Sequence, residues 1–270
     1  MCMHQGIRSI VKCVTLIPLL RLYNRKVGRG GFEGDYASWS EVKCAAGGYD
    51  SPAILDRVRA AVLKVKRGEA VFERDSVCFY HEEYRWPALA CLLRVAAEQG
   101  GRLRVLDFGG SLGSFYFQHR KHFAGLREVR WAVVEQPHFV QCGNQEFADD
   151  VLEFHESIDA CLNAGKIDVI FLSSVLQYLE EPYEWLRTFA GTGVPWLLLD
   201  RTPFIEREQD RLTVQYVPPE IYPASYPAWF FSRKRFAEAL EKAGYREIVR
   251  FDAQDDMGIG KFEGVLLERA

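Results

Sequence analysis

Residues 104–114 read Arg-Val-Leu-Asp-Phe-Gly-Gly-Ser-Leu-Gly-Ser, and this stretch decides the fold class. An apolar strand runs into the acidic residue Asp107 and then into a glycine-rich turn, after which a helical segment begins. Gly109, Gly110 and Gly113 allow the backbone to turn sharply and to approach a ligand closely. Open parallel sheets bind ligands at the carboxyl ends of their strands, which is where Asp107 stands. The stretch therefore predicts a nucleotide-binding α/β sheet, with an ordinary tight turn as the alternative.

The order of the glycines narrows the kind of nucleotide. A dinucleotide-binding turn needs Gly-x-Gly-x-x-Gly, and Ser111 stands where its second glycine belongs. A phosphate-binding P-loop needs Gly-Lys-Ser/Thr, and no lysine follows Gly113. The remaining pattern resembles the Asp/Glu-x-Gly-x-Gly-x-Gly loop of class I S-adenosylmethionine-dependent methyltransferases, with Ser111 at the middle glycine and an extra Gly110 before it. An NAD-dependent enzyme is therefore disfavoured.

Composition and charge exclude several other classes. The chain has 270 residues, 48% of them hydrophobic and 26% charged, as in an ordinary soluble domain. Its net charge of -3 gives no basic field for nucleic acid, so no nucleic-acid partner is expected. The seven cysteines include no Cys-x-x-Cys pair, which favours free thiols in the cytoplasm. No His-Glu-x-x-His arrangement occurs, and no metal is expected.

The first thirty residues form a basic segment of their own. Apolar residues recur at helical spacing from Ile7 to Ile17, and no acidic residue precedes Glu33. The uncharged stretch 13–20 is too short to span a bilayer. Residues 7–29 are therefore expected to form an amphipathic helix, which either packs on protein or lies peripherally on the inner membrane surface.

Apolar strands alternate with helices after the first hundred residues. The expected strands are 105–108, 131–135, 151–155, 168–172 and 196–200. The expected helices after them are 115–123, 141–147, 157–164, 183–189 and 232–243. Continuous apolar runs of this length are typical of strands buried on both faces of a parallel sheet. Residues 246–251 and 264–268 then leave no room for a helical crossover and predict a terminal antiparallel hairpin, which is the class I methyltransferase layout.

This pattern predicts that the chain is divided into three parts. Residues 1–30 are expected to be the basic amphipathic helix, and residues 31–101 a helical cap with helices from Ser51-Pro52 and over about 84–99. Residues 102–270 are expected to form the S-adenosylmethionine-binding domain, a Rossmann-like sheet with helices on both faces. The segment 202–231, rich in proline and aromatic residues, either covers the site or packs on the core.

Polar residues at the strand ends are the candidate donor site. Glu135 ends the second strand, where an acid accepts hydrogen bonds from ribose hydroxyls, and Gln136 follows it. Glu156 and Ser157 follow the third strand, where adenine contacts are usual in this class, although Ser157 could equally cap the next helix. Ser173 and Ser174 follow the fourth strand. The expected cofactor-binding set is Asp107, Gly109, Gly110, Ser111, Gly113, Glu135, Gln136, Glu156, Ser157, Ser173 and Ser174.

The acceptor side lacks an obvious base. The segment 173–179 resembles the Ser-x-Leu-His-His pattern of small-molecule methyltransferases, with Gln177 and Tyr178 in place of the histidines. Either residue can orient a substrate, but neither is a strong base at neutral pH. Asp200 is the better base, with pairing to an arginine such as Arg201 as the alternative. We therefore expect Asp200 and Tyr178 to be the catalytic residues.

Four segments together resemble a poorly characterised family of class I methyltransferases. They are Leu-Asp-Phe-Gly-Gly-x-x-Gly at 106–113, Glu-Gln-Pro at 135–137, Ser-Ser-x-Leu-Gln-Tyr-Leu at 173–179 and Asp-Arg-Thr-Pro at 200–203. Trp39, residues 48–50 and residues 85–87 add to the resemblance, which covers the chain from about residue 32. Similar proteins occur among surface-polysaccharide biosynthesis functions, which implies a small-molecule or glycan acceptor. The expected acceptor-binding residues are Gln177, Tyr178, Arg201, Tyr84, Arg85 and Tyr226.

The resemblance implies methyl transfer from S-adenosylmethionine, at a hydroxyl group. The protein then acts mainly by holding donor and acceptor in line. The alternative is a nucleotide-binding scaffold without activity in a glycan assembly complex, because the two histidines are missing.

Overall fold

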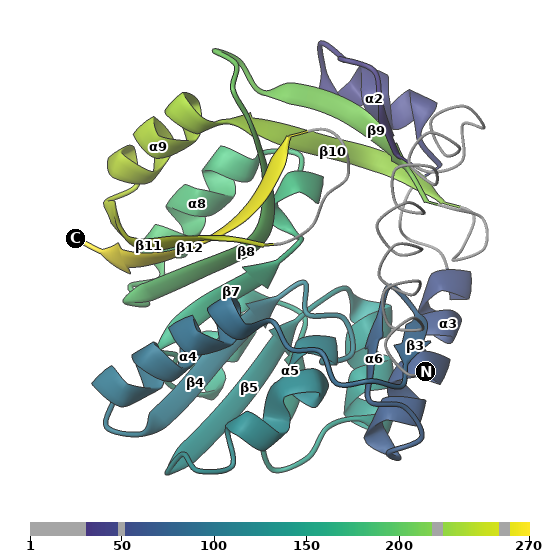
Figure 1. Ribbon diagram of the computed structural model, residues 1–270, viewed down its shortest axis with the longest axis vertical. Coiled ribbons are helices and arrows are strands. Elements are labelled where there is room, and N and C mark those ends of the chain that lie inside the picture. The colour runs from purple at the N-terminus through teal and green to yellow at the C-terminus, as the bar shows by residue number, and fades with distance from the viewer. Residues whose placement is uncertain (1–30, 48–51, 218–223, 254–259) are drawn as a thin grey trace, which may run out of the picture.

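The computed structural model describes residues 31–47, 52–217, 224–253 and 260–270 (Figure 1). The basic segment expected to be helical at residues 7–29 lies outside these ranges. Within them, every helix is too short or too polar to cross a bilayer.

In the described part of the chain, ten strands form one sheet and two more form a separate hairpin. The large sheet contains β1 (Gly31–Glu33), β4 (Arg102–Phe108), β5 (Glu128–Val134), β6 (Leu152–His155), β7 (Val169–Ser173), β8 (Trp196–Ile205), β9 (Arg211–Tyr216), β10 (Ser225–Ser232), β11 (Tyr245–Asp252) and β12 (Lys261–Arg269). The hairpin consists of β2 (Phe72–Arg74) and β3 (Val77–Phe79).

Helices lie before, between and after the parallel strands. They are α2 (Trp39–Ala45), α3 (Pro52–Lys66), α4 (Trp86–Glu98), α5 (Ser114–His119), α6 (Pro137–Glu146), α7 (Ile158–Ala164), α8 (Pro182–Gly191) and α9 (Arg233–Lys242), with short 3-10 turns η1 (Arg120–His122) and η2 (Leu176–Tyr178). Proline at the first turn starts α6 and α8 earlier than the apolar pattern predicts, because proline fits that turn without losing a hydrogen bond.

The strand order confirms the expected fold class. β6, β5, β4, β7 and β8 are neighbours in that order and are parallel. β12 runs antiparallel beside β8, and β11 pairs with β12, which is the expected terminal hairpin. The order reverses between β4 and β7, so the carboxyl ends of these two strands mark the switch point where such sheets bind ligands.

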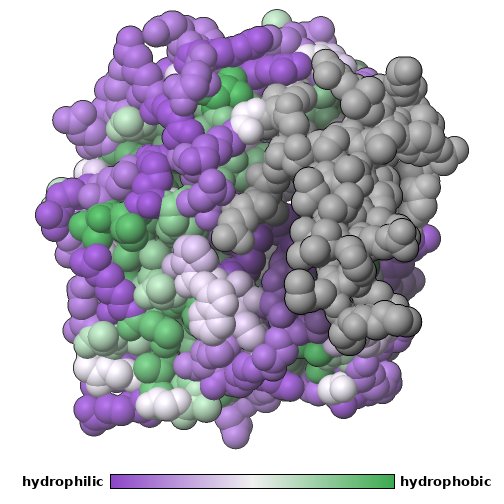
Figure 2. Space-filling view, viewed as in Figure 1, coloured by the Kyte–Doolittle hydropathy of each residue, from purple (hydrophilic) through white to green (hydrophobic). Residues whose placement is uncertain are grey.

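Helices cover both faces of the sheet and bury alternate strand residues. Val105 and Phe171 face the core that contains α3, α4, α5 and α6. Leu106 and Leu172 face the opposite core, which contains α7, α8 and α9. Because the strands place successive side chains on opposite faces, a continuous apolar run fills both cores. On the face that Figure 2 shows, hydrophilic residues predominate among the described ones, with apolar residues between them.

Two parts of the chain differ from the sequence expectation. Residues 31–101 are not purely helical, because they include β1 and the β2–β3 hairpin. The described parts of the segment 202–231 contain strands that were not expected from the sequence: β8 continues to Ile205, and β9 and β10 pair antiparallel beyond it. β-branched and aromatic residues in 211–216 and 225–232 favour this extended pairing. β1 joins β9, and α2 packs on β9 and β10, at the top of Figure 1.

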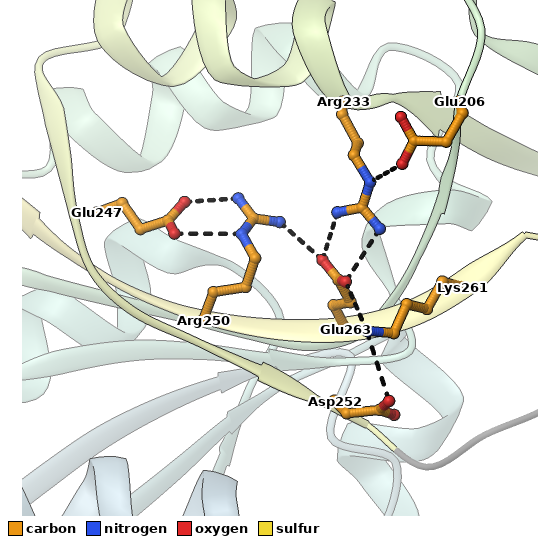
Figure 3. A network of polar contacts seen from close by, with 7 residues as sticks. All are labelled: Glu206, Arg233, Glu247, Arg250, Asp252, Lys261 and Glu263. Carbon is orange, nitrogen blue, oxygen red and sulfur yellow. Dashed lines mark hydrogen bonds and ion pairs between the residues drawn. The ribbon is translucent and has the colours of Figure 1, made fainter.

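A charged network fastens the terminal hairpin to α9 (Figure 3). Glu263 of β12 accepts hydrogen bonds from Arg233 of α9 at 2.6 and 2.9 Å and from Arg250 of β11 at 3.0 Å. Burial acts to raise the pKa of Glu263, but the bonds from Arg233 and Arg250 outweigh it and lower that pKa to about 2. Buried ions need such partners, so this carboxylate is structural.

Candidate functional site

A cavity of about 1190 Å³ lies at the carboxyl ends of the parallel strands. Its walls include the turn after β4 and the ends of β5 and β7, together with residues of α2, the β2–β3 hairpin and β10. Most of the residues expected at the donor site line it: Asp107, Gly109, Gly110, Ser111, Glu135, Gln136, Glu156, Ser157, Ser173 and Ser174. The topology thus brings together residues from four strand ends that are far apart in sequence.

Gly109 and Gly113 both adopt the left-handed backbone conformation in the glycine turn. Gly109 has φ +73°, and a Cβ there would lie 2.7 Å from the Val175 side chain. Its amide donates to the carbonyl of Val134 at 2.9 Å, which ties the turn to β5. Gly113, with φ +82°, precedes the first residue of α5, and unlike the other residues expected at the donor site it is not part of the described cavity lining. Glycine adopts these left-handed conformations without a steric cost.

Asp107 lies beneath the turn and explains Gly110. A Cβ on Gly110 would lie 2.4 Å from both Cγ and Oδ2 of Asp107. The Asp107 side chain is 2% exposed and accepts a hydrogen bond from Trp131 Nε1 at 2.9 Å. Burial, with a smaller contribution from the negative charge of Glu135, raises the pKa of Asp107 to about 7. The carboxyl group is therefore near its midpoint at neutral pH.

Glu135 stands at the end of β5 and lines the same cavity. The backbone amide of Gln136 donates to Glu135 Oε2 at 2.7 Å. Burial raises the pKa of Glu135, opposed by hydrogen bonds from the backbone of Gln136 and Ser111. The carboxylate can accept further hydrogen bonds from a ligand, since each oxygen has two lone pairs.

Glu156 and Ser157 are exposed residues at the end of β6. Ser157 Oγ accepts from the amide of Ala160 at 3.1 Å and so caps α7, which is the alternative that the sequence allowed. Both residues also line the cavity, beside the apolar Ile158 and Leu162.

Asp200 is a buried carboxylate that lies beside Ser173 and Arg85. Its side chain is 1% exposed, and it does not belong to the described cavity lining. Ser173 Oγ donates to Asp200 Oδ2 at 2.8 Å, and Arg85 Nη2 lies 3.6 Å from the same oxygen. The structure thus has the paired carboxylate that was the alternative to a base, and the arginine that pairs with it is Arg85.

Gln177 and Tyr178 occupy different positions. Gln177 is 1% exposed, lies outside the described lining, and donates to Ser174 Oγ at 2.9 Å and to the carbonyl of Arg201 at 3.3 Å. Tyr178 lines the cavity with Tyr226, and their rings meet edge to face with centroids 5.1 Å apart. Burial raises the pKa of Tyr178, so its hydroxyl stays neutral at physiological pH.

Tyr84 and Arg85, both expected to bind the acceptor, differ in whether they line the cavity. Arg85 lines the cavity, whereas Tyr84 packs against the rings of His119 and His122. The amide of Arg85 donates to His119 Nε2 at 3.0 Å. Burial lowers the pKa of His119 to about 4, so this histidine is a neutral acceptor that positions the start of α4.

Backbone strain concentrates at this cavity. In the ranges that the structure describes, five residues other than glycine have positive φ, and all five line it: Asp75, Ser76, Ser111, Ser174 and Arg201. Such conformations persist where the surrounding structure enforces them, and they cluster at functional sites.

Sequence reasoning missed the part of the wall formed by α2 and by the β2–β3 hairpin. Trp39 and Lys43 come from α2, and Glu73, Asp75 and Ser76 come from the hairpin. The available signal was the run Phe-Glu-Arg-Asp-Ser-Val-Cys-Phe at 72–79, two extended segments around a two-residue turn. Asp-Ser is a weak turn sequence compared with Asn-Gly, although both turn residues adopt φ > 0.

Comparisons with known proteins give fold neighbours at low identity. No protein-family model matches the chain, and no curated protein matches it. Magnesium protoporphyrin IX methyltransferase from Synechocystis PCC 6803, with bound S-adenosylmethionine, is 13% identical, with a TM-score of 0.49 over 83% of this chain and 99% of that one. The amino pentose methyltransferase CalS10 from Micromonospora echinaspora is 13% identical, with a TM-score of 0.47 over 70% and 92%. A Burkholderia thailandensis 1,6-didemethyltoxoflavin-N1-methyltransferase is 14% identical, with a TM-score of 0.48 over 89% and 94%. At these identities and TM-scores, the function of this chain must rest on its own site.

Proposed function

We propose that this chain is an S-adenosylmethionine-dependent methyltransferase that acts on a hydroxyl group of a small-molecule or glycan acceptor. The observation that carries the proposal is that one cavity, at the switch point between β4 and β7, is lined by both the glycine turn and Glu135. A carboxylate at the end of the second parallel strand suits the two ribose hydroxyls of the donor. Glycine at positions 109 and 110 leaves the backbone of the turn uncovered, so the methionine part of the donor can lie close against it.

The electrostatics of the cavity support a cationic donor. Asp107 is buried and Glu135 is half-buried, and no ion pair reaches either of them within the described ranges. Buried carboxylates without a cation are costly, and they are found where function needs them. A sulfonium or ammonium group would offset that cost.

The volume of the cavity supports the binding of an acceptor beside the methyl donor. The cavity of about 1190 Å³ exceeds the range of roughly 300–1,000 Å³ for sites that hold one drug-sized molecule. Trp39, Tyr178 and Tyr226 line it on the side of α2 and β10, and aromatic faces suit sugar rings or aromatic acceptors. The glycan part of the proposal rests on these rings and on the family resemblance.

Calorimetry tests the donor assignment. We expect S-adenosylmethionine and S-adenosylhomocysteine to bind with 1:1 stoichiometry, and NADH to give no heat of binding. Transfer of a tritiated methyl group to hydroxyl probes, with methyl glycosides, UDP-glucose and catechol as the panel, then tests the reaction. Binding without transfer to any probe would favour the inactive scaffold, and absence of binding would contradict a donor site.

A further inference from the structure

Glu73 is a buried carboxylate that the β2–β3 hairpin brings to the cavity wall. Its side chain is 7% exposed, and it lines the cavity together with Arg74 and the turn residues Asp75 and Ser76. β2 packs against α5, the helix that follows the glycine turn, and against α3. Glu73 therefore lies on the cavity wall, on a strand that contacts the helix after the glycine turn.

Neutral donors hold this carboxylate. The amide of Ser76 donates to Glu73 Oε2 at 3.1 Å, and the hydroxyl of Ser114 donates to Oε1. Ser114 is the first residue of α5 and directly follows Gly113. These bonds orient the carboxylate from two independent elements and leave lone pairs for a further partner.

Two buried acids that lie outside the cavity lining have a basic partner. Asp168 pairs with Arg104 at 2.8 Å, and Glu263 pairs with Arg233 at 2.6 Å. No ion pair reaches Glu73 in the part of the chain that the structure describes, and the guanidinium of the adjacent Arg74 lies 2.6 Å from Glu83. Acids that only support the fold are usually paired when buried, so an unpaired acid in a cavity wall indicates a functional group.

The surroundings of Glu73 bring the pKa of its carboxyl group close to neutral pH. Burial raises its pKa to about 7, against the bonds from Ser114 and Ser76, with smaller effects from the charges of Asp75 and Arg74. Across the hairpin, Glu73 pairs in register with Cys78, whose pKa is raised mainly by burial. A carboxyl group of this kind exchanges a proton readily at neutral pH, which is what a general base requires.

We propose that Glu73 is the general base that takes the proton of the acceptor hydroxyl, an inference that rests on the proposed methyl transfer. As the proton moves to the Glu73 carboxylate, the acceptor oxygen forms a bond to the methyl carbon. The carbon–sulfur bond breaks, its electron pair stays on sulfur, and the positive charge of the sulfonium is lost. Glu73 then releases the proton to solvent, so no oxidant or metal is needed. Asp200, which is enclosed by Ser173 and Arg85, keeps a structural role.

Glu73→Gln is the matched substitution, because the amide oxygen still accepts a hydrogen bond but cannot take a proton. At pH 8 we expect kcat on a methylated probe from the same panel to fall by roughly 100-fold or more. Binding of S-adenosylhomocysteine by calorimetry should stay within about threefold. Wild-type kcat/KM should rise with pH through about 7, and Glu73→Gln should lose that rise. Glu83→Gln is the control, because Glu83 lies near the hairpin but outside the described lining.

A second readout needs no turnover. The infrared band of a protonated carboxyl that Glu73→Gln removes should fade as the pH rises through about 7. A band that fades near pH 4.5 would overturn the proposal, and so would a Glu73→Gln variant that keeps the wild-type rate and pH profile. A wild-type protein that binds S-adenosylhomocysteine but methylates no hydroxyl probe would contradict the proposed function itself, and the base assignment with it.

Discussion

Gly110→Ala tests how the glycine turn is built. The backbone of Gly110 is not in the left-handed region, so alanine is disfavoured only by the space that its Cβ needs. That Cβ would lie 2.4 Å from Cγ and Oδ2 of Asp107, well inside van der Waals contact. Asp107 has a short side chain fixed by Trp131 Nε1 at 2.9 Å, so it cannot swing away without losing that bond.

The expected cost follows from these contacts. Overpacking of this kind costs about 1–3 kcal/mol. Displacing Asp107 also breaks its bond to Trp131 and leaves a buried polar group without a partner, which adds about 1–3 kcal/mol. We therefore expect Gly110→Ala to lower the free energy of unfolding by about 2–4 kcal/mol, since the two effects overlap in part.

Urea unfolding followed by circular dichroism measures this difference. Gly125→Ala is the matched control, because nothing lies within 4 Å of a Cβ at that position, and it should change stability by less than about 0.5 kcal/mol. Asp107→Ala removes the clashing atoms, so the double variant should show a favourable coupling of about 1–2 kcal/mol. If Gly110→Ala were as stable as Gly125→Ala, or if the double variant were additive, the contact would not be the reason for glycine.

Three further predictions concern carboxylates. Glu135→Gln should weaken S-adenosylhomocysteine binding roughly ten- to a hundredfold in calorimetry, because a charged acceptor of two hydroxyls is lost, whereas Glu128→Gln on the same strand should leave it unchanged. For Asp107, whose folded pKa of about 7 exceeds the ordinary value of 3.8, stability present at low pH is lost as the pH rises towards 7. Asp107→Asn should therefore gain stability over the wild type between pH 4 and 7, by at most ~4 kcal/mol, and a constant difference in urea titrations would contradict this. Asp200→Asn should lower the free energy of unfolding by about 3 kcal/mol, because Arg85 loses its buried partner, while the pH profile of methyl transfer stays as in the wild type; a lost pH dependence would return the base role to Asp200.

The sheet could be predicted because its signal is local. Each parallel strand is a short apolar run bounded by polar residues, and such runs are recognisable in a single sequence. The terminal hairpin followed from the short connection after residue 251. β9 and β10 were missed because Pro227 and the aromatic residues of β10, such as Trp229, are compatible with both a loop and an edge strand.

The candidate site was predictable where its residues follow strand ends. Asp107 and Glu135 stand at positions that the topology alone brings together. The arginine partner of Asp200 was not predictable, because Arg85 lies far away in sequence, just before α4, and only packing decides which arginine reaches the carboxylate. Glu73 was missed for the same reason: its burial depends on how the β2–β3 hairpin lies against α5.

A crystal structure of the complex with S-adenosylhomocysteine tests the central claim most directly. The account predicts the ribose hydroxyls within hydrogen-bond distance of the Glu135 carboxylate, and the sulfur near the glycine turn on the side that faces Glu73. A ligand bound elsewhere, or one whose ribose lies away from Glu135, would contradict the assignment of this cavity as a methyl-donor site.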